Sequence, residues 1–166
     1  EIKKKYGQVS LMTATNVFAH MATMGEVISG IETLLKDDGV FIAENHYLLD
    51  VVQRCQFDTI YHEHLSYIAL RPLILFFERN GMKVFNAQRV DSHGGSIRIF
   101  VKKYNGNFKI NSSVNSLVKL ELSKKLNSVS TLKEFAKRIE RNKIKLLHLL
   151  KDLKKKQKKI IGYGAP

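Results

Sequence analysis

Residues 61–67 hold the densest group of side chains that could transfer protons. The seven positions carry two histidines, a carboxylate, two phenols and a hydroxyl. Imidazole titrates near neutral pH, and a neighbouring Glu or Tyr can orient it or adjust its pKa. The residue types and their spacing are compatible with general acid–base chemistry. They are equally compatible with a solvated loop that has no catalytic role.

The composition is that of a globular protein of modest size. The chain has 166 residues, 44% of them hydrophobic, which predicts a buried core and one domain, or one domain plus part of another. Its single cysteine, Cys55, excludes an internal disulfide and suits a cytoplasmic location. No apolar stretch reaches the roughly 18 residues of a membrane span, so no membrane partner is expected. The sequence lacks an initial Met and stops within a Gly-rich segment, which suggests a fragment.

The net charge of +13 comes from one region of the chain. Residues 102–159 contain 18 Lys or Arg against 4 Asp or Glu, whereas the first hundred residues are nearly neutral. Aromatic side chains that could stack on bases do not interleave with this basic run, and Lys outnumbers Arg. A solvated helix face explains the charge better than a nucleic-acid partner. A basic nucleic-acid-binding module is the weakest of three functional alternatives.

A strand–helix–strand pattern opens the chain. Residues 9–15 and 40–43 are near-continuous apolar runs, and residues 25–36 carry an apolar helical stripe that Asp37, Asp38 and Gly39 end with a turn. Two apolar strands joined by a helix predict a parallel sheet that is covered on both faces. Ligands of such sheets bind beyond the carboxyl ends of the strands. Residues 15–20 and 44–47 are therefore candidate site segments.

An antiparallel pair is expected downstream. A helix over 73–80 ends at Gly81, and strands over 83–90 and 96–102 are joined by the short Gly-rich link 91–95. The whole pattern predicts an α/β fold, the second half of a doubly wound sheet with antiparallel final strands.

The remainder of the chain is expected to connect two domains. A capping box formed by Thr131 and Glu134 predicts the start of a long helix, whose apolar positions recur near heptad spacing. Residues 159–165 resemble a new strand running into a Gly turn. We therefore expect a helical linker over 105–158 and the first strand of a second α/β domain over 159–166.

Several segments together resemble a known family. They occur in order at residues 13–20, 34–41, 57–67 and 93–98. In this order they resemble the S-adenosylmethionine-dependent C-methyltransferases that act on nucleotide-linked 4-keto-deoxysugars. The resemblance covers most of residues 9–102, and residues 162–166 resemble the start of that family's C-terminal α/β domain. Tyr61–His64 followed by Leu-Ser-Tyr is its most specific part.

The resemblance implies a domain plan. Residues 1–104 would be the C-terminal half of a Rossmann-like class I methyltransferase domain. The family's N-terminal zinc domain, its Gly-rich cofactor loop and the acidic residue for the cofactor ribose have no counterpart here. S-adenosylmethionine is the implied cofactor, and zinc would belong only to the N-terminal domain. This fragment alone is expected to be inactive, and nothing indicates its oligomeric state.

The resemblance also implies roles for the central run. Methylation of a sugar carbon requires removal of the C3 proton next to the 4-keto group, which gives an enolate that attacks the methyl donor. His64 is the implied base, with Tyr61 and Glu63 assisting, and His62 is a weaker candidate.

Other candidate site residues surround this run. Thr15, Asn16 and His20 would line the methionine end of the cofactor, although Asn16 could instead cap the following helix. The implied contacts to a nucleotide-diphosphate sugar are Glu44, Tyr47, Tyr67, His93, Ser96 and Arg98.

Two alternatives remain open at this point. His62 and His64, with Glu63 or His46, could form part of a metal site, but the three or four ligands that zinc needs are not evident and no metal is expected. An O- or N-methyltransferase acting on another small acceptor is the second enzymatic possibility.

Overall fold

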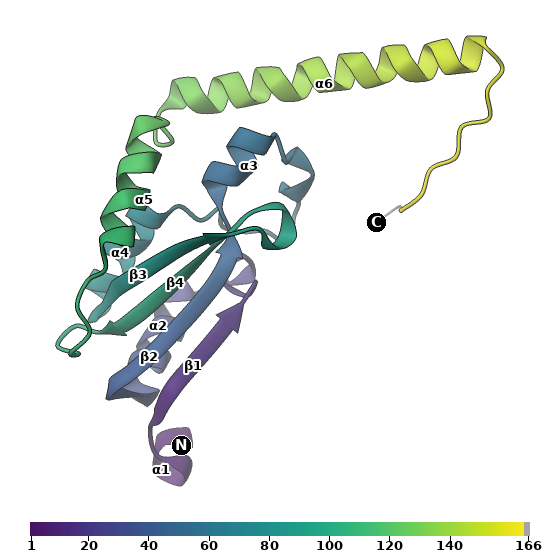
Figure 1. Ribbon diagram of the computed structural model, residues 1–166. Coiled ribbons are helices and arrows are strands. Elements are labelled where there is room, and N and C mark those ends of the chain that lie inside the picture. Colours follow the sequence, from purple (N-terminus) through teal and green to yellow (C-terminus); the bar gives the residue numbers. More distant parts are fainter. Residues whose placement is uncertain (165–166) are drawn as a thin grey trace. The chain divides into compact units, whose positions relative to one another are not determined.

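The computed structural model describes residues 1–164 (Figure 1). Residues Glu1–Asn127 form one compact unit, and a second unit begins at Ser128. The strands are β1 (Val9–Thr15), β2 (Leu35–His46), β3 (Met82–Val90) and β4 (Ser96–Lys103). The α-helices are α1 (Ile2–Tyr6), α2 (Met24–Leu34), α3 (Leu48–Arg54), α4 (Leu70–Arg79), α5 (Ser112–Ser123) and α6 (Val129–Lys155). Short 3-10 helices are η1 (Phe18–His20), η2 (Phe57–Thr59) and η3 (Ser92–Gly94).

The four strands form a mixed sheet in the order β1-β2-β4-β3. β1 and β2 are parallel, as the strand–helix–strand pattern predicts, and β4 is antiparallel to both β2 and β3. The predicted antiparallel finish is thus confirmed. The mixed α/β arrangement fits the second half of a Rossmann-like sheet.

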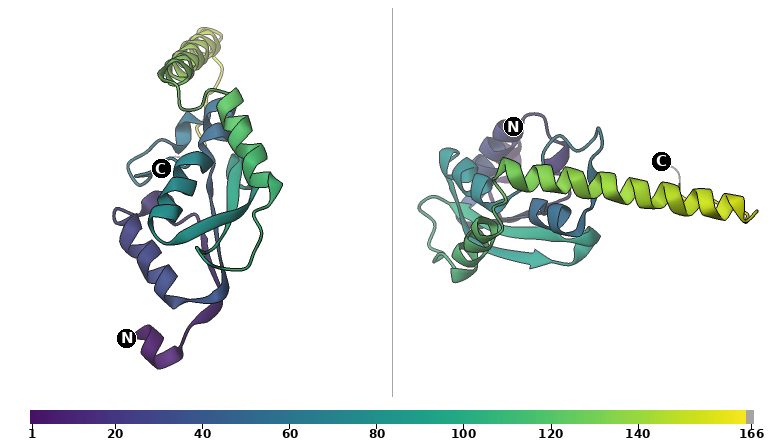
Figure 2. Two further views of the ribbon diagram at one scale, coloured as in Figure 1. Left: turned by 90° about the vertical axis from the view of Figure 1, so that its left-hand side faces the viewer. Right: turned by 90° about the horizontal axis from the view of Figure 1, so that it is seen from above.

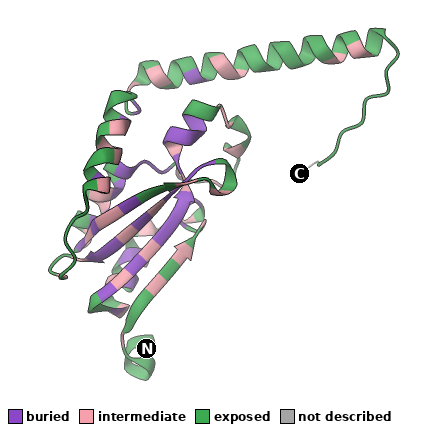
Figure 3. Ribbon diagram, viewed as in Figure 1, coloured by how far each residue is buried: buried purple, intermediate pink, exposed green. Residues whose placement is uncertain are grey.

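The core lies between the sheet and two helices. Helices α2 and α4 lie on one face of the sheet (Figures 1 and 2). Phe41 of β2 meets Phe77 of α4, with ring centres 6.3 Å apart, and Phe18 of η1 completes an edge-on aromatic cluster. In β4, Ile97, Ile99 and Val101 are buried, and Arg98 and Phe100 between them are half-buried, whereas Ser96 at the start of the strand is fully buried. Burial is therefore strongest in the central strands β2 and β4 (Figure 3).

Two local expectations for the first sheet segment are wrong. β1 is largely exposed rather than buried, because it is the outermost strand and one of its edges has no strand partner among residues 1–164. Asp37, Asp38 and Gly39 do not form a turn outside the sheet. They lie within β2 as an irregularity, since Val9 pairs with Leu35 whereas Leu11 pairs with Val40.

The capping-box prediction for the long helix is also wrong. α6 begins at Val129, three residues after Leu126, and its N-cap is Ser128, whose hydroxyl accepts a hydrogen bond from the backbone N–H of Ser130. Glu134 forms an ion pair with Arg141 instead of returning to the helix start. An earlier hydroxyl thus satisfies one of the N-terminal amide groups.

The predicted linker over 105–158 contains two different helices. α5 belongs to the first unit, where the backbone N–H of Asn111 donates to the carbonyl of Phe85 in β3. α6 belongs to the second unit. Residues 159–164 are exposed and form no strand, and residues 165 and 166 of the predicted strand and turn lie outside the described residues. The domain boundaries proposed from the sequence stay predictions.

Candidate active site

Four histidines gather where the strands β1 and β2 end. The ring centre of His64 lies 4.9 Å from that of His20 and 5.3 Å from that of His46. His46 lies in turn 6.0 Å from His93. They come from η1, the end of β2, the loop after η2 and the η3 turn. The sheet therefore brings together segments 73 residues apart at its carboxyl edge, where parallel strands present their ligand sites.

His64 is held in one tautomer by the backbone. Its Nδ1 lies 2.7 Å from the carbonyl oxygen of Thr59. A carbonyl can only accept a hydrogen bond, so Nδ1 of the neutral ring carries the proton and Nε2 carries the lone pair. The hydroxyl of Tyr61 lies 3.2 Å from Nε2 and donates to it. The ring thus presents a basic nitrogen that is hydrogen-bonded to a phenol.

Glu63 and His62 lie outside this arrangement. Their side chains are 61% and 89% exposed, and Glu63 Oε1 lies 4.0 Å from His62 Nε2. Within the described chain Glu63 makes no hydrogen bond to His64. Thr59, which sequence reasoning did not single out, takes the orienting part that was expected of Glu63.

His46 lies between His64 and His93. It falls within the predicted site segment 44–47 and was named individually only in the metal alternative. Partial burial lowers its pKa, and the nearby imidazoles of His64, His93 and His20 lower it further, while the carboxylate of Asp58 opposes them. The ring is therefore neutral at pH 7. The signal in the sequence was its place at the carboxyl end of a predicted strand.

Glu44 and Arg98 form a cross-strand ion pair on the same face of the sheet as His46. They are paired in the β2–β4 register, and Arg98 Nε lies 2.8 Å from Glu44 Oε2. The hydroxyl of Ser92 donates to Glu44 Oε1 over 2.6 Å. That hydrogen bond and the Arg98 charge hold the pKa of Glu44 below its ordinary value, although burial acts in the opposite direction. Glu44 and Arg98, both predicted to contact the substrate, are thus paired with each other.

The turn that carries His93 is held by side chains from the end of α3 and from the residues just after it. The carbonyl of Gly94 accepts hydrogen bonds from Arg54 Nη1 (2.8 Å) and Gln56 Nε2 (2.6 Å). Gly95 has a φ of 128°, and a Cβ at this position would lie 2.4 Å from Cγ of the fully buried Asp50. Only glycine fits there. His93 itself has a φ of 50°, so its ring is placed by a turn with little freedom.

Two asparagines at the strand ends have unpaired polar atoms. Asn45 is 1% exposed, and neither its Oδ1 nor its Nδ2 has a hydrogen-bond partner in residues 1–164. The Oδ1 of Asn16 is also buried without a partner, and this residue has a φ of 54°. Thr15, beside Glu44 in the sheet register, is exposed. Buried polar atoms without partners are rare and mark a place for a bound polar group.

The side chains of the remaining predicted substrate residues make their contacts away from the histidine rings, although Ser96 is the cross-strand partner of His46. Tyr47 is fully buried, and its hydroxyl donates to Glu121 Oε1 over 2.9 Å. Burial first, and then the Glu121 carboxylate, raise the pKa of Tyr47. Ser96 is fully buried and donates to the carbonyl of Ser92. Tyr67 lines a small apolar depression with residues of α4.

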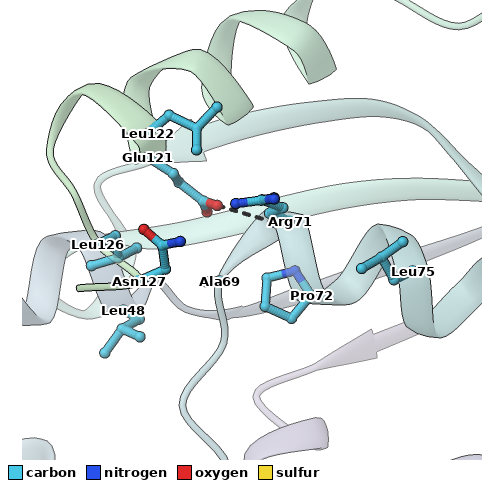
Figure 4. A pocket seen from close by; sticks show the side chains of 9 residues that line it. All are labelled: Leu48, Ala69, Arg71, Pro72, Leu75, Glu121, Leu122, Leu126 and Asn127. Atoms are coloured by element: carbon cyan, nitrogen blue, oxygen red, sulfur yellow. Dashed lines mark hydrogen bonds between the residues drawn. The ribbon is translucent and has the colours of Figure 1, made fainter. Parts of the chain in front are cut away.

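Glu121 holds together three parts of the first unit. Its Oε1 also accepts from the backbone N–H of Leu70 (2.6 Å), and its Oε2 accepts from that of Arg71 (3.1 Å). It therefore caps the N-terminus of α4 from another helix and satisfies amide groups that have no partner within α4. Figure 4 shows this carboxylate at the wall of an apolar pocket of about 310 Å³. The pocket is lined by Leu48, Ala69, Arg71, Pro72, Leu75, Glu121, Leu122, Leu126 and Asn127, and shares no residue with the histidine cluster.

Neither a metal centre nor a membrane segment is found in residues 1–164. The four histidines are not placed to hold one metal ion together, and no other three His, Cys, Asp or Glu side chains there are. No helix there combines the length and apolar character needed to cross a bilayer.

Comparison with known proteins identifies the family. Residues 91–166 match the family model described as "C-methyltransferase C-terminal domain". The chain is 35% identical over all its 166 residues to C-methyltransferase NovU of Streptomyces niveus. It belongs to the C-methyltransferase family. The chain spans 40% of the length of NovU, so that protein contains substantial regions with no equivalent in this C-methyltransferase chain.

Some solved structures are similar over part of the chain. One is a chain from the complex between the Haloferax volcanii Trm112 methyltransferase activator and a candidate methyltransferase, with 13% identity and a TM-score of 0.48 over 60% of this chain and 55% of that one. Another is magnesium protoporphyrin IX methyltransferase from Synechocystis with bound SAH, with 11% identity and a TM-score of 0.45 over 62% of this C-methyltransferase chain and 48% of that one. Scores below 0.5 do not establish a shared fold.

Proposed function

We propose that this chain is part of an S-adenosylmethionine-dependent enzyme that methylates C3 of a nucleotide-linked 4-keto-deoxysugar in the cytoplasm. Membership of the C-methyltransferase family supports the transfer of a methyl group to carbon. The observation that carries the proposal is the fixed tautomer of His64, because carbon methylation requires a base whose lone pair is available at neutral pH. The sugar substrate rests on the sequence resemblance.

His64 is suited to remove a proton from carbon. The Thr59 carbonyl keeps Nδ1 protonated and stabilises the imidazolium that forms when Nε2 accepts the substrate proton. The hydroxyl of Tyr61 now bonds to Nε2, so a substrate must replace it there. Tyr61 would then be free to bond to the sugar beside the base.

The strand ends fit the polar part of a cofactor. S-adenosylmethionine, when bound, would supply the electrophilic methyl group. The unpaired amides of Asn16 and Asn45 and the exposed imidazole of His20 would hold its polar groups. The fit is chemical, since an amide offers N–H donors for the carboxylate of a methionine moiety and a carbonyl acceptor for its ammonium.

The Glu44–Arg98 pair is less suited to binding a phosphate than an arginine without an acidic partner would be. Arg98 is held by two contacts to Glu44, so its charge is largely compensated. We propose that this pair keeps the substrate side of β2 and β4 in register and that Ser92 and His93 project beside it. A direct Arg98–phosphate contact would require the ion pair to share its guanidinium.

Hydrogen exchange at the sugar carbon tests the function. The full-length protein should catalyse entry of solvent deuterium at C3 of a nucleoside-diphosphate 4-keto-deoxyhexose without the methyl donor, as followed by NMR. His64→Gln should slow this exchange by about 10³-fold. The matched control is His148→Gln, an exposed residue of α6, which should exchange at the wild-type rate.

The same assay separates this function from O- or N-methylation. Only carbanion chemistry labels carbon, so methylation of an acceptor without any C3 exchange would favour a transferase to oxygen or nitrogen. A wild-type exchange rate in His64→Gln would contradict only the assignment of His64 as the base.

A further inference from the structure

We propose that His46 donates a hydrogen bond to the carbonyl oxygen of the substrate and stabilises the enolate that forms when His64 removes the adjacent proton. This inference rests on the proposed carbon methylation and adds a second catalytic residue to it. The base and the group that stabilises the oxyanion would then come from two neighbouring imidazoles.

The spacing of the two rings suits the two reacting atoms. An α-carbon and its carbonyl oxygen lie about 2.4 Å apart, given standard bond lengths. Each must lie within about 3 Å of its partner nitrogen. The ring centres of His64 and His46 are 5.3 Å apart with their planes inclined at 53°. Both rings can therefore present a nitrogen to neighbouring atoms of one small substrate.

His46 has an unused donor, whereas the other nearby donors are engaged. The hydroxyl of Tyr61 bonds to His64, and the guanidinium of Arg98 is paired with Glu44. No hydrogen bond to either ring nitrogen of His46 is found in the described chain, although the side chain is half-buried. A half-buried imidazole without partners at the ligand edge of a sheet is available to a substrate.

The electrostatics favour a neutral donor. His46 is faced by His20 of η1, His64 of the following loop and His93 of η3, and by the carboxylate of Asp58 in η2. Burial and the three imidazoles outweigh the carboxylate and lower the pKa of His46. A cationic His46 would weaken His64 as a base, but a neutral N–H can polarise a carbonyl without this cost.

The chemical step is balanced within the substrate and the two rings. Nε2 of His64 accepts the C3 proton, the C–H electron pair forms the C3–C4 double bond, and the carbonyl π electrons move to oxygen. The N–H of His46 bonds to that oxygen throughout and is not transferred. Without a methyl donor, His64 returns a proton or deuteron to C3 and restores the ketone.

The infrared carbonyl band of the bound substrate gives a direct test. The full-length protein would be mixed with a nucleoside-diphosphate 4-keto-deoxyhexose labelled with carbon-13 at C4. We expect the bound carbonyl to absorb at lower frequency in the wild type than in solution, and to return toward the solution value in His46→Phe. Deuterium exchange at C3 should slow by about 100-fold in this variant.

Three further variants make the test specific. His46→Gln restores an N–H donor and should recover part of both signals. His64→Gln should lose exchange but keep the carbonyl shift, because it removes only the base. His148→Phe should match the wild type in both measurements.

The outcomes distinguish this inference from the proposed function. One outcome is that the wild type exchanges the C3 proton while His46→Phe changes neither the carbonyl band nor the exchange rate. That result would overturn the role of His46 and leave the base assignment of His64 intact. The proposed function itself would be overturned if the wild type exchanged the C3 proton of none of a panel of nucleoside-diphosphate 4-keto-deoxyhexoses.

Discussion

His46 and Tyr47 are neighbours at the end of β2, yet they lie in opposite kinds of environment. Tyr47 is fully buried and bonds to Glu121, whose carboxylate also binds two backbone amides. His46 is half-exposed among three other histidines, and its imidazole has no hydrogen-bond partner in residues 1–164. Polar groups that are buried and paired stabilise a fold, whereas polar groups that converge unpaired are free to bind a ligand.

Hydrogen-bond pairing explains why the Glu121 network can be buried, whereas the histidine cluster lies in contact with solvent. Each hydrogen bond to Glu121 replaces one that water would make, so the burial of the carboxylate is compensated. The histidine cluster keeps contact with solvent and does not need compensation. Removal of a residue from the first network should therefore affect mainly stability, and removal from the second mainly activity.

The largest effect on stability is expected for Glu121→Ala. The hydroxyl of Tyr47 and the amides of Leu70 and Arg71 would lose their acceptor, and the start of α4 would lose its cap. We expect a loss of about 3 kcal/mol in the free energy of unfolding, measured by urea titration.

A matched carboxylate on the surface provides the control for that measurement. Glu140 is exposed and forms an ion pair with Lys143 on the same helix, so Glu140→Ala should change the free energy of unfolding by less than about 0.5 kcal/mol. Equal losses in the two variants would mean that the Glu121 network is not a stabilising element.

Tyr47→Phe should have an intermediate effect. It removes a single hydroxyl and leaves Glu121 its two backbone donors, so the free energy of unfolding should fall by about 1 kcal/mol. C3 exchange by the full-length protein should persist at the wild-type rate, because Tyr47 does not reach the histidines. If Tyr47→Phe folds but exchanges the C3 proton much more slowly, the result would support the sequence-based prediction that Tyr47 contacts the substrate.

The smallest effect concerns the pH dependence of stability. The folded-state pKa of His46 lies below its usual value near 6.5, so the unfolded chain binds the proton more tightly. Its contribution to stability is therefore complete above about pH 6.5 and is lost as the pH falls through 6.5 toward the folded pKa. In His46→Phe the urea midpoint should change less between pH 7.5 and pH 5.5 than in the wild type. The difference should equal a few tenths of a kcal/mol in the free energy of unfolding, since solvent screens a half-exposed ring.

Glu44 provides an internal check on that profile. Its pKa is lowered as well, but its contribution is lost only below the ordinary carboxyl pKa of about 4.5. A change in slope confined to pH values below 4.5 in His46→Phe would contradict the assignment to His46.

Periodicity and resemblance gave the correct order of the main elements. Apolar runs on either side of a helical stripe predicted the parallel pair β1–β2, and the short Gly-rich link predicted the antiparallel pair β3–β4. They did not show that β1 is exposed, since a strand's place at the edge of a sheet depends on its neighbours and not on its own residues. The capping-box pattern misplaced the start of α6, because more than one hydroxyl near Thr131 can serve as the N-cap.

The candidate site divides in the same way. Residue chemistry alone singled out the histidine-rich run and the polar ends of two strands. Which of those side chains meet was decided by tertiary contacts, because the carbonyl of Thr59, the pairing of Glu44 with Arg98 and the carboxylate of Glu121 lie outside any local pattern. The sequence by itself determined that bases were present at the ligand edge of a sheet. Only the packed structure decided that His64 has its lone pair on Nε2, that His46 joins it, and that Tyr47 belongs to the core.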